Sequence, residues 1–476
     1  MKRLTNTLFQ SVDGASLAVV RILFGLVMFA WCISYLALGK IQNFYVEPTY
    51  HFKYVGFHWV QVASESAMTS IFLLMGASAL LIALGWFYRI AAIGFAILFI
   101  YVFLVDKTTY QNHYYFVCLM SLLMASVPAN RAWSVDNRLG RIATSSSVPM
   151  WSIWLIRFQV GVVYFFGGVA KISPDWIQGF PMRGMLAQQE SHVLLAPFAH
   201  EEWAVQTIVW GGMLFDLLIV PLLLWKRTRI LAFCLVVFFH ITNSIMFPIG
   251  IFPWIMIGLT SIFLEPDWPR RLLRPEEESI PVSRSNTDTL SSWRTAIVTL
   301  LVAWCLVQVT LPFRHWLYPG NVNWTERGHY FSWHMMLRGK RSAIRFHILD
   351  PVTGRRGIYP LQNDLQTHQL ARMSRDPELI RDFACHIEAT CQSHGFRDVE
   401  VRAFVLCSLN GRRPQLLISP EVDLTSPELR STEDWVIPLS EPLPQEIWEH
   451  PLTSWEQLVM TDPLNSYMPP RAEPSS

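Results

Sequence analysis

Charged residues are scarce in this chain: they make up 16% of its 476 residues, and the formal net charge is only +2. Soluble domains typically carry about 25% charged residues. Domains that bind nucleic acids concentrate basic residues on one face, and we find no basic stripe interleaved with aromatic residues. The scarcity of charge therefore argues against an ordinary soluble protein, and we expect no nucleic-acid partner.

The cysteines form no recognisable framework. None of the seven belongs to a CxxC pair or to a Cys/His spacing typical of zinc sites. The histidines also lack HxxxH and HExxH spacing, so the sequence predicts no metal site. Four cysteines lie in apolar segments, and three lie in the polar C-terminal part, where one disulfide could form (Cys385, Cys391 and Cys407).

Apolar residues, by contrast, make up 52% of the chain and gather in long runs before residue 316. Nine runs have about the 17–25 residues that a helix needs to cross a bilayer. They lie at 15–38, 66–86, 88–105, 113–129, 150–171, 203–225, 229–246, 248–264 and 293–313. With the N-terminus inside, most lysines and arginines fall in inner loops, and the positive-inside rule then places the C-terminal part on the extracytoplasmic face.

The predicted fold class is a membrane all-α bundle of about nine transmembrane helices in residues 1–316. An extramembrane α+β domain (317–425) and a Pro/Glu/Ser-rich tail (426–476), loosely ordered at its end, follow it. Some apolar runs are short or interrupted, so eight spans are the alternative. In the α+β domain we expect strands at 343–349 and 357–360, a helix that begins at Pro377 with Asp376 as its cap, and a hairpin with the turn Asn410-Gly411.

Lys171 stands where the fifth apolar run ends. Gly167 and Gly168 precede it by about one turn and allow another backbone to approach, and Pro174 prevents the helix from continuing. Low polarity disfavours the charged form of a lysine, so we expect a neutral amine that could act as a base. A lone lysine at a helix end is more often a snorkelling anchor, but an anchor needs neither the glycine pair nor the proline.

The nine-span arrangement brings four polar segments to the outer end of the bundle: residues 106–115, Lys171, residues 240–248 and residues 321–336. Such convergence predicts a mostly apolar pocket with a few polar groups. Each residue also has a structural interpretation. His113 could cap a helix, His240 and Asn243 could bind a facing helix, and His329 and His334 could lie on the domain surface. The charged residues within spans are expected to pair inside the bundle (Arg21, Arg157 and Asp216).

Several motifs, in order along the chain, resemble the vitamin K-dependent gamma-glutamyl carboxylases. They are Val12-Asp13-Gly14-Ala15, Asp106-Lys107-Thr108 with Asn112-His113, Trp133-Ser134-Val135-Asp136, Gly167-Gly168-Val169-Ala170-Lys171 with Asp175-Trp176, Phe239-His240 with Asn243-Ser244, Glu265-Pro266-Asp267-Trp268, Asn323-Trp324-Thr325, and Phe331-Ser332-Trp333 with Met335-Met336. The match runs from about residue 11 to about 425. The chain resembles a short, bacterial-type member with the horizontally transferred transmembrane domain.

The resemblance implies an integral membrane enzyme that uses reduced vitamin K (the hydroquinone), O2 and CO2, with a glutamyl-containing peptide or protein as its partner and no metal. In that family the lysine matching Lys171 deprotonates the hydroquinone, which is oxygenated to its epoxide. The strong base so generated removes a glutamyl γ-hydrogen, and CO2 adds to the carbanion. His113 would serve carboxylation, and Asn112 would hold a quinol oxygen. The cofactor contacts would further include Tyr164, His240, Asn243, Met335 and Met336, and the substrate contacts Trp333, His334 and Arg338.

Two departures from the family leave alternatives open. The animal enzymes carry Lys-Lys where this chain has Ala170-Lys171, and a cysteine of their first outer loop is disulfide-bonded to the soluble domain, whereas residues 39–65 contain no cysteine. The first alternative is a quinol epoxidase with altered or lost protein carboxylation. From other classes come a membrane transporter or proton relay using Asp216, Arg157 and His240, and a non-catalytic scaffold.

Overall fold

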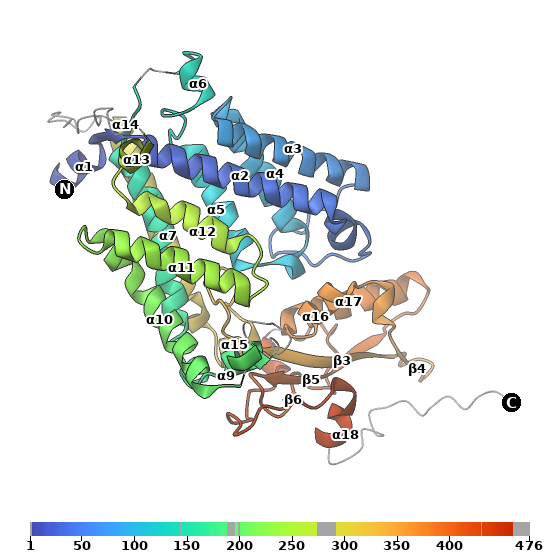
Figure 1. The fold of residues 1–476 in the computed structure, drawn as a ribbon. Helices are drawn as coiled ribbons and strands as arrows, with labels where there is room; N and C mark the ends of the chain where they lie inside the picture. Colours follow the sequence, from blue (N-terminus) through green and yellow to red (C-terminus); the bar gives the residue numbers. More distant parts are fainter. Residues whose placement is uncertain are drawn as a thin grey trace.

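The computed structural model describes residues 2–142, 145–187, 196–198, 200–273, 292–429 and 431–459. Residues 274–291, between the last two predicted spans, and the end of the expected tail lie outside the described residues. Figure 1 shows a helical bundle with the N-terminus at one end and a small mixed domain at the other.

Seven helices of the described chain are long and apolar enough to cross a membrane. They are α2 (Ala15–Ala37), α3 (Glu65–Leu84), α4 (Tyr88–Val105), α7 (Met150–Ala170), α10 (Glu202–Leu224), α11 (Arg229–Met246) and α14 (Ser292–Thr310), which continues into η5 (Leu311–Leu317). The two other predicted segments form shorter helices, α5 (Asn112–Ser126) and α12 (Phe252–Thr260), the latter followed by η4 (Ser261–Phe263). Helices thus form at all nine predicted positions, and the count of nine spans stays a prediction.

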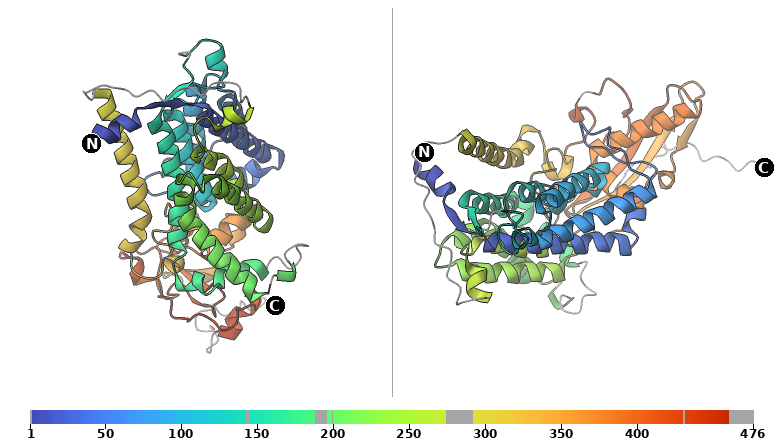
Figure 2. Two further views of the ribbon diagram at one scale, coloured as in Figure 1. Left: turned by 60° about the vertical axis from the view of Figure 1, so that its left-hand side comes forward. Right: turned by 90° about the horizontal axis from the view of Figure 1, so that it is seen from above.

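The remaining short elements of the bundle are α1 (Lys2–Leu8), β1 (Ser11–Asp13), η1 (Gln42–Val46), η2 (Lys107–Thr109), α6 (Val135–Arg138), β2 (Ser147–Pro149), α8 (Pro174–Ile177), α9 (Phe180–Ala187), η3 (Ala196–Phe198) and α13 (Trp268–Leu273). β1 pairs antiparallel with β2. Figure 2 shows α14 at the periphery of the bundle, where it packs against α7.

Two buried arginines bind the carbonyl groups of helix ends. Arg21 of α2 donates to the carbonyl oxygens of Ile82 and Ala83, at the end of α3, at 2.8 and 2.6 Å. Arg157 of α7 donates to the carbonyls that follow α12, including Ile262 at 2.8 Å. The last carbonyls of a helix have no partner within it, so each guanidinium satisfies groups that would otherwise be costly inside a membrane. The expected pairing within the bundle is therefore right in kind, but backbone carbonyls take the place of charged partners.

The outer domain is built on a four-stranded antiparallel sheet in the order β4-β3-β5-β6. Its elements are α15 (Val322–Thr325), β3 (Lys340–Leu349), β4 (Arg356–Ile358), η6 (Leu361–Asn363), α16 (Thr367–Met373), α17 (Pro377–Ser393), β5 (Glu400–Leu409), β6 (Gln415–Leu416), η7 (Thr432–Asp434), η8 (Leu452–Ser454) and α18 (Trp455–Val459). The predicted strands, the hairpin and the helix that Asp376 caps are confirmed; the Asp376 side chain accepts a hydrogen bond from the backbone N–H of Glu378.

Residues beyond Thr425 contribute to the core of this domain. Trp435 is 2% exposed and packs in the main core between the sheet and α17. Trp455 is fully buried against Phe404 and Leu406 of β5. The polar segment after Thr425 is thus attached to the sheet as far as Val459.

The first outer loop of the bundle also enters this core. Phe52 is fully buried there, with its ring centroid 6.1 Å from that of Phe383. The side chain of Gln369 of α16 also donates a hydrogen bond to the carbonyl oxygen of Tyr50, in the same loop, at 2.8 Å. All seven cysteines are free. Apolar packing and hydrogen bonds therefore join the loop to the domain where the animal enzymes are expected to have a disulfide.

Candidate active site

A cavity of about 930 Å³ lies at the outer end of the bundle. Its membrane side is formed by α5, α7, α10, α11 and α12, and its outer side by residues 329–338 and the end of α16. The cavity brings together ten of the eleven predicted site residues: Asn112, His113, Tyr164, Lys171, His240, Asn243, His334, Met335, Met336 and Arg338. The eleventh, Trp333, packs beside the cavity against Tyr115, with ring centroids 5.1 Å apart.

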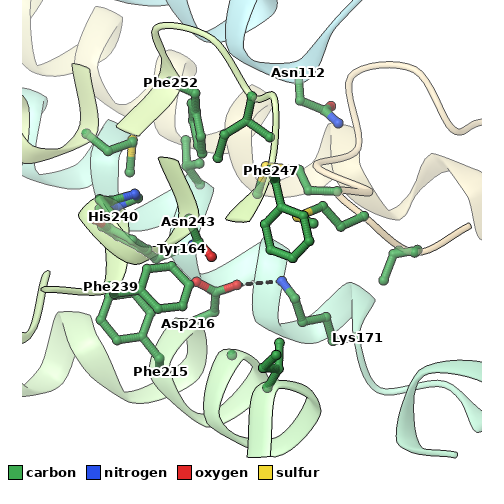
Figure 3. A pocket seen from close by; sticks show the side chains of 18 of the residues that line it. Asn112, Tyr164, Lys171, Phe215, Asp216, Phe239, His240, Asn243, Phe247 and Phe252 are labelled. Carbon is green, nitrogen blue, oxygen red and sulfur yellow. Dashed lines mark hydrogen bonds and ion pairs between the residues drawn. The ribbon is translucent and has the colours of Figure 1, made fainter. Parts of the chain in front are cut away.

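Lys171 forms a buried ion pair with Asp216 (Figure 3). The amine nitrogen lies 2.6 Å from Oδ2 of Asp216 and also donates to the carbonyl oxygen of Gly167 at 3.1 Å. Only 7% of Lys171 and 6% of Asp216 is exposed. Sequence reasoning treated Lys171 as an amine without a partner, and this was wrong, because the structure places the carboxylate of Asp216 beside it.

The two glycines before Lys171 permit this geometry. An added Cβ at Gly168 would lie 3.0 Å from the backbone nitrogen of Leu217, which adjoins Asp216 on α10. An added Cβ at Gly167 would lie 2.8 Å from Cε of Met335 and 3.4 Å from Oδ2 of Asp216. The predicted close backbone approach is therefore present at Gly168, whereas Gly167 leaves room for groups that line the cavity.

A second polar group lines the membrane side of the cavity. The hydroxyl of Tyr164 lies 2.8 Å from Nε2 of His240 and 3.2 Å from the hydroxyl of Thr260. Among the described residues, Nδ1 of His240 has no hydrogen-bond partner, although the histidine is only 2% exposed. Asn243 follows on the same helix about one turn later. Nδ1 of His240 is therefore a buried polar atom without a partner in a residue that lines the cavity.

Asn112 ties the start of α5 to the outer segment. Its side-chain nitrogen donates to the carbonyl oxygen of His334 at 3.0 Å, and its Oδ1 accepts from the hydroxyl of Tyr110 at 3.0 Å. That hydroxyl in turn accepts from the backbone N–H of Phe331 at 2.7 Å. His113 packs beside Phe252, with ring centroids 6.0 Å apart. Asn112 thus has an evident structural role, and its predicted contact with a quinol oxygen stays a prediction.

The outer segment has an unusual backbone. Phe331, Trp333 and Met336 all have positive φ angles, at 63°, 59° and 58°. Residues with side chains rarely adopt this left-handed conformation, and such strain gathers at functional sites. The conformation turns Met335 and Met336 into the cavity lining while Trp333 stays buried. None of these three positions is a glycine, so the sequence does not predict the left-handed turns.

The outer end of the cavity is cationic. Arg338, Arg372 and Arg375 line it, and the Arg338 side chain is paired with buried Glu326 at 2.7 Å. Burial, together with the positive charges of Arg372 and Arg338, lowers the pKa of Arg375. Burial, together with the charges of His315 and Arg338, lowers the pKa of His334 to about 3, so this histidine is neutral.

Sequence reasoning missed Arg372, Arg375 and the aromatic walls of Phe215, Phe239 and Phe252. Arg372 lies in the last turn of α16 and Arg375 just after this helix. Both reach the cavity only because the outer domain docks there, so no local sequence pattern predicts them. Asp216 did carry a signal, because an acid within a span needs a partner. Among the described residues, no group of three potential metal ligands gathers.

Two family models match the chain. The HTTM domain matches residues 9–268, the bundle without its last helix, and the vitamin K-dependent gamma-carboxylase lumenal domain matches residues 293–442. No solved structure matches the chain. The two models follow one another along the chain and together cover the cavity and most of the outer domain. The resemblance inferred from the motifs is thus confirmed, and this integral membrane protein belongs to the vitamin K-dependent gamma-carboxylase family.

Proposed function

We propose that this protein oxygenates vitamin K hydroquinone to its epoxide and couples this reaction to glutamyl γ-carboxylation. The observation that carries the proposal is the Lys171–Asp216 pair, buried in the wall of a large apolar cavity. The reaction generates a base stronger than any side chain, and water would quench this base. The proton transfer that starts the reaction therefore needs a site from which water is excluded. The outer domain covers the cavity, and we place that domain on the extracytoplasmic face because of the charge asymmetry and the lumenal-domain match.

We infer that the cavity opens toward the lipid between α10 and α11, because lining residues of both helices are exposed. Four residues that line it also have exposed side chains on these helices: Leu214 (46%), Leu218 (51%), Leu235 (42%) and Phe238 (67%). An isoprenoid quinol dissolves in the bilayer, so it needs such a lateral entrance. The opening therefore supports a lipid-soluble ligand over a water-soluble one.

The lining fits a flat aromatic ring. Phe215 and Phe239 are stacked with centroids 3.8 Å apart, and Phe252, Met335 and Met336 add apolar surface. The unpartnered Nδ1 of His240 can accept a hydrogen bond from a quinol hydroxyl. When bound, reduced vitamin K supplies the chemistry of its own oxidation by O2, which drives removal of the glutamyl hydrogen.

Lys171 and Asp216 act together in the proton transfer. An ammonium group cannot accept a proton, but transfer of one proton to Asp216 leaves a neutral amine at the cavity wall. The 2.6 Å contact permits this transfer, and displacement of water by an apolar ligand disfavours the charged form of both groups. Lys171 then accepts a hydroxyl proton from the ligand while Asp216 holds the first proton.

The cationic outer end suits the second substrate. A glutamyl carboxylate can pair with the guanidinium groups of Arg338, Arg372 or Arg375, which are half-buried and line the cavity. Neutral His334 adds a hydrogen-bonding group without further charge. This arrangement favours carboxylation over epoxidation alone.

The test uses purified protein in detergent with vitamin K hydroquinone, a Glu-containing peptide and labelled bicarbonate. We expect epoxide and labelled peptide from the wild type, neither from Lys171→Ala, and both from the control Lys226→Ala, whose side chain is 81% exposed. Epoxide without labelled peptide would favour the epoxidase alternative. A wild type that binds quinol and yields no epoxide would refute the proposal.

A further inference from the structure

A single turn of the outer domain contacts both walls of the cavity. Asn410 and Arg412 lie in the turn between β5 and β6, and both bind Asp175 of α8. Arg412 donates to the two carboxylate oxygens at 2.7 and 2.9 Å, and the Asn410 side chain donates to Oδ2 at 2.7 Å. Asp175, Asn410 and Arg412 are 7%, 3% and 5% exposed, so this contact is shielded from water.

Asp175 connects the turn to Lys171. Lys171 caps α7, and the backbone N–H of Ser173 donates to the Lys171 carbonyl at 2.9 Å. Trp176, directly after Asp175, is 2% exposed and lines the cavity, and its ring centroid lies 5.2 Å from the Lys171 amine. Its indole N–H donates to the carbonyl of Val209 on α10 at 3.1 Å. The position of α8 therefore determines which face of the Lys171 amine is covered.

Asn410 connects the same turn to the opposite wall. Its backbone N–H donates to the carbonyl of Gly339 at 2.8 Å, and its Oδ1 accepts from the backbone N–H of Gly339 at 2.7 Å. Its side-chain nitrogen also lies 3.4 Å from the carbonyl oxygen of Leu337. Residues 335–338, which line the cavity, directly precede Gly339. One side chain thus bridges α8 and the segment that carries Met335, Met336 and Arg338.

The bidentate contact between Arg412 and Asp175 has a defined geometry. Although burial disfavours the ionised form of Asp175, the hydrogen bonds from Arg412 and Asn410 outweigh it and keep the pKa of this carboxyl below its usual value. A planar guanidinium that binds both carboxylate oxygens fixes distance and orientation, which a lysine cannot do. The outer domain is therefore attached to the Lys171 segment in one defined geometry.

We propose that Asp175, Asn410 and Arg412 are positioning residues through which the outer domain sets the geometry of Lys171 for proton transfer. They act through Trp176 and the 335–339 segment without contacting the reacting atoms. In this way the state of the outer domain, which presents the glutamyl site, is coupled to the quinol site. The proposal rests on the function proposed above for Lys171.

The alternative is that the three residues only hold the domains together, and the test must separate the two. The double variant Asp175→Asn/Arg412→Gln removes both charges and leaves no unpaired buried ion. Arg412→Lys keeps the charge without the bidentate geometry. The matched control is Arg345→Gln, which breaks an ion pair of 2.6 Å with Glu456 elsewhere in the same domain.

Two measurements are made on each purified full-length variant. The first is reductive methylation of Lys171 with formaldehyde and sodium cyanoborohydride, which reduces the imine to a methylamine; it is quantified by peptide mass spectrometry against pH. The second is hydroquinone epoxidation, resolved into kcat and KM.

For the double variant we expect Lys171 to be methylated about tenfold faster, because loss of local order exposes the amine. We also expect the pH profile of this methylation to be shifted. We also expect kcat to fall about tenfold with little change in KM; Arg412→Lys should lie between, and Arg345→Gln should match the wild type.

Methylation that follows the wild-type rate and pH profile in both the double variant and Arg412→Lys would overturn the proposal. A change in methylation of equal size in Arg345→Gln would also overturn it, since any loosening of the domain would then suffice. The methylation arm does not depend on quinol chemistry. A wild type without epoxidase activity would thus refute the proposed function, while the methylation result would still decide whether the outer turn positions Lys171.

Discussion

The amine of Lys171 lies 2.6 Å from Oδ2 of Asp216, and this contact joins the end of α7 to the middle of α10 inside the wall of the cavity. It gives a partner to Asp216, the only acid among the described residues that line the cavity. A buried pair of opposite charges costs desolvation energy that a contact at this distance largely offsets, whereas a single buried charge has nothing to offset it. Neither residue is therefore expected to tolerate loss of the other.

The first prediction concerns this pair. Asp216→Asn leaves the Lys171 ammonium buried without a carboxylate and should lower the free energy of unfolding by about 3–5 kcal/mol. The double variant Lys171→Met/Asp216→Asn should regain most of that stability and still form no epoxide. Thermal unfolding in detergent measures the first effect, and the epoxidation assay measures the second.

The control for the pair is an exposed one. Glu456→Gln, which removes the partner of partly exposed Arg345, should change stability by less than about 1 kcal/mol. If Asp216→Asn were as stable as Glu456→Gln, the pair would have no stabilising role.

The second prediction concerns the contact between α7 and α10. Gly168→Ala places a methyl group 3.0 Å from the backbone nitrogen of Leu217, so the helices must move apart, at a cost of about 1–3 kcal/mol. Because Leu217 adjoins Asp216, the ion pair should loosen and the epoxidation rate should fall. Gly161→Ala is the control on the same helix: its added Cβ would meet Val220 at an ordinary 3.5 Å.

Gly161→Ala should preserve activity and keep or slightly raise stability, since alanine is the better helix former. Equal losses of activity in the two variants would show that the close approach at Gly168 has no special importance.

A structural feature of this protein can be predicted from the sequence when residues close together in the chain determine it. The apolar runs, the cap at Asp376 and the turn at Asn410-Gly411 are set by neighbouring residues, and all form as predicted. Convergence of Lys171 and His240 on one cavity followed from topology, because loops of the same face lie at the same end of a bundle. The partner of Lys171, the left-handed turns at Trp333 and Met336, and the arginines of the outer end depend on how α10 and the outer domain dock, which no local pattern encodes.

The third prediction concerns pH. His329 and His334 are buried beside arginines, and burial together with these positive charges lowers both pKa values, for His334 to about 3. A histidine with an ordinary pKa near 6.5 when unfolded takes up a proton on unfolding below that pH. The stability is therefore complete above pH 6.5 and is lost as the pH falls from 6.5 toward 3. Each histidine should contribute a loss of about 2 kcal/mol by pH 5.

The measurement is the melting temperature in detergent between pH 5 and pH 8. Between pH 8 and pH 5, the melting temperature of His334→Gln should fall by less than that of the wild type. His58→Gln, which changes an exposed histidine, should follow the wild-type curve. A His334→Gln curve parallel to that of the wild type would contradict a neutral, buried His334.

The last prediction concerns the attachment of the first outer loop. Phe52 is fully buried in the outer-domain core beside Phe346 and Phe383, so Phe52→Ala should cost about 3–5 kcal/mol and free the loop. Phe57, in the same loop, is 39% exposed, and its replacement by alanine should change stability by about 0.5 kcal/mol or less.

Limited trypsin digestion measures how firmly the loop is attached. Lys53, the trypsin site, adjoins Phe52 and donates to the carbonyl of Val105 at 3.2 Å, so release of the loop should expose it to cleavage. We expect faster cleavage after Lys53 in Phe52→Ala only. Equal cleavage in the two variants would mean that hydrogen bonds such as the one from Gln369 to the Tyr50 carbonyl, and not the buried ring, hold the loop in place of a disulfide.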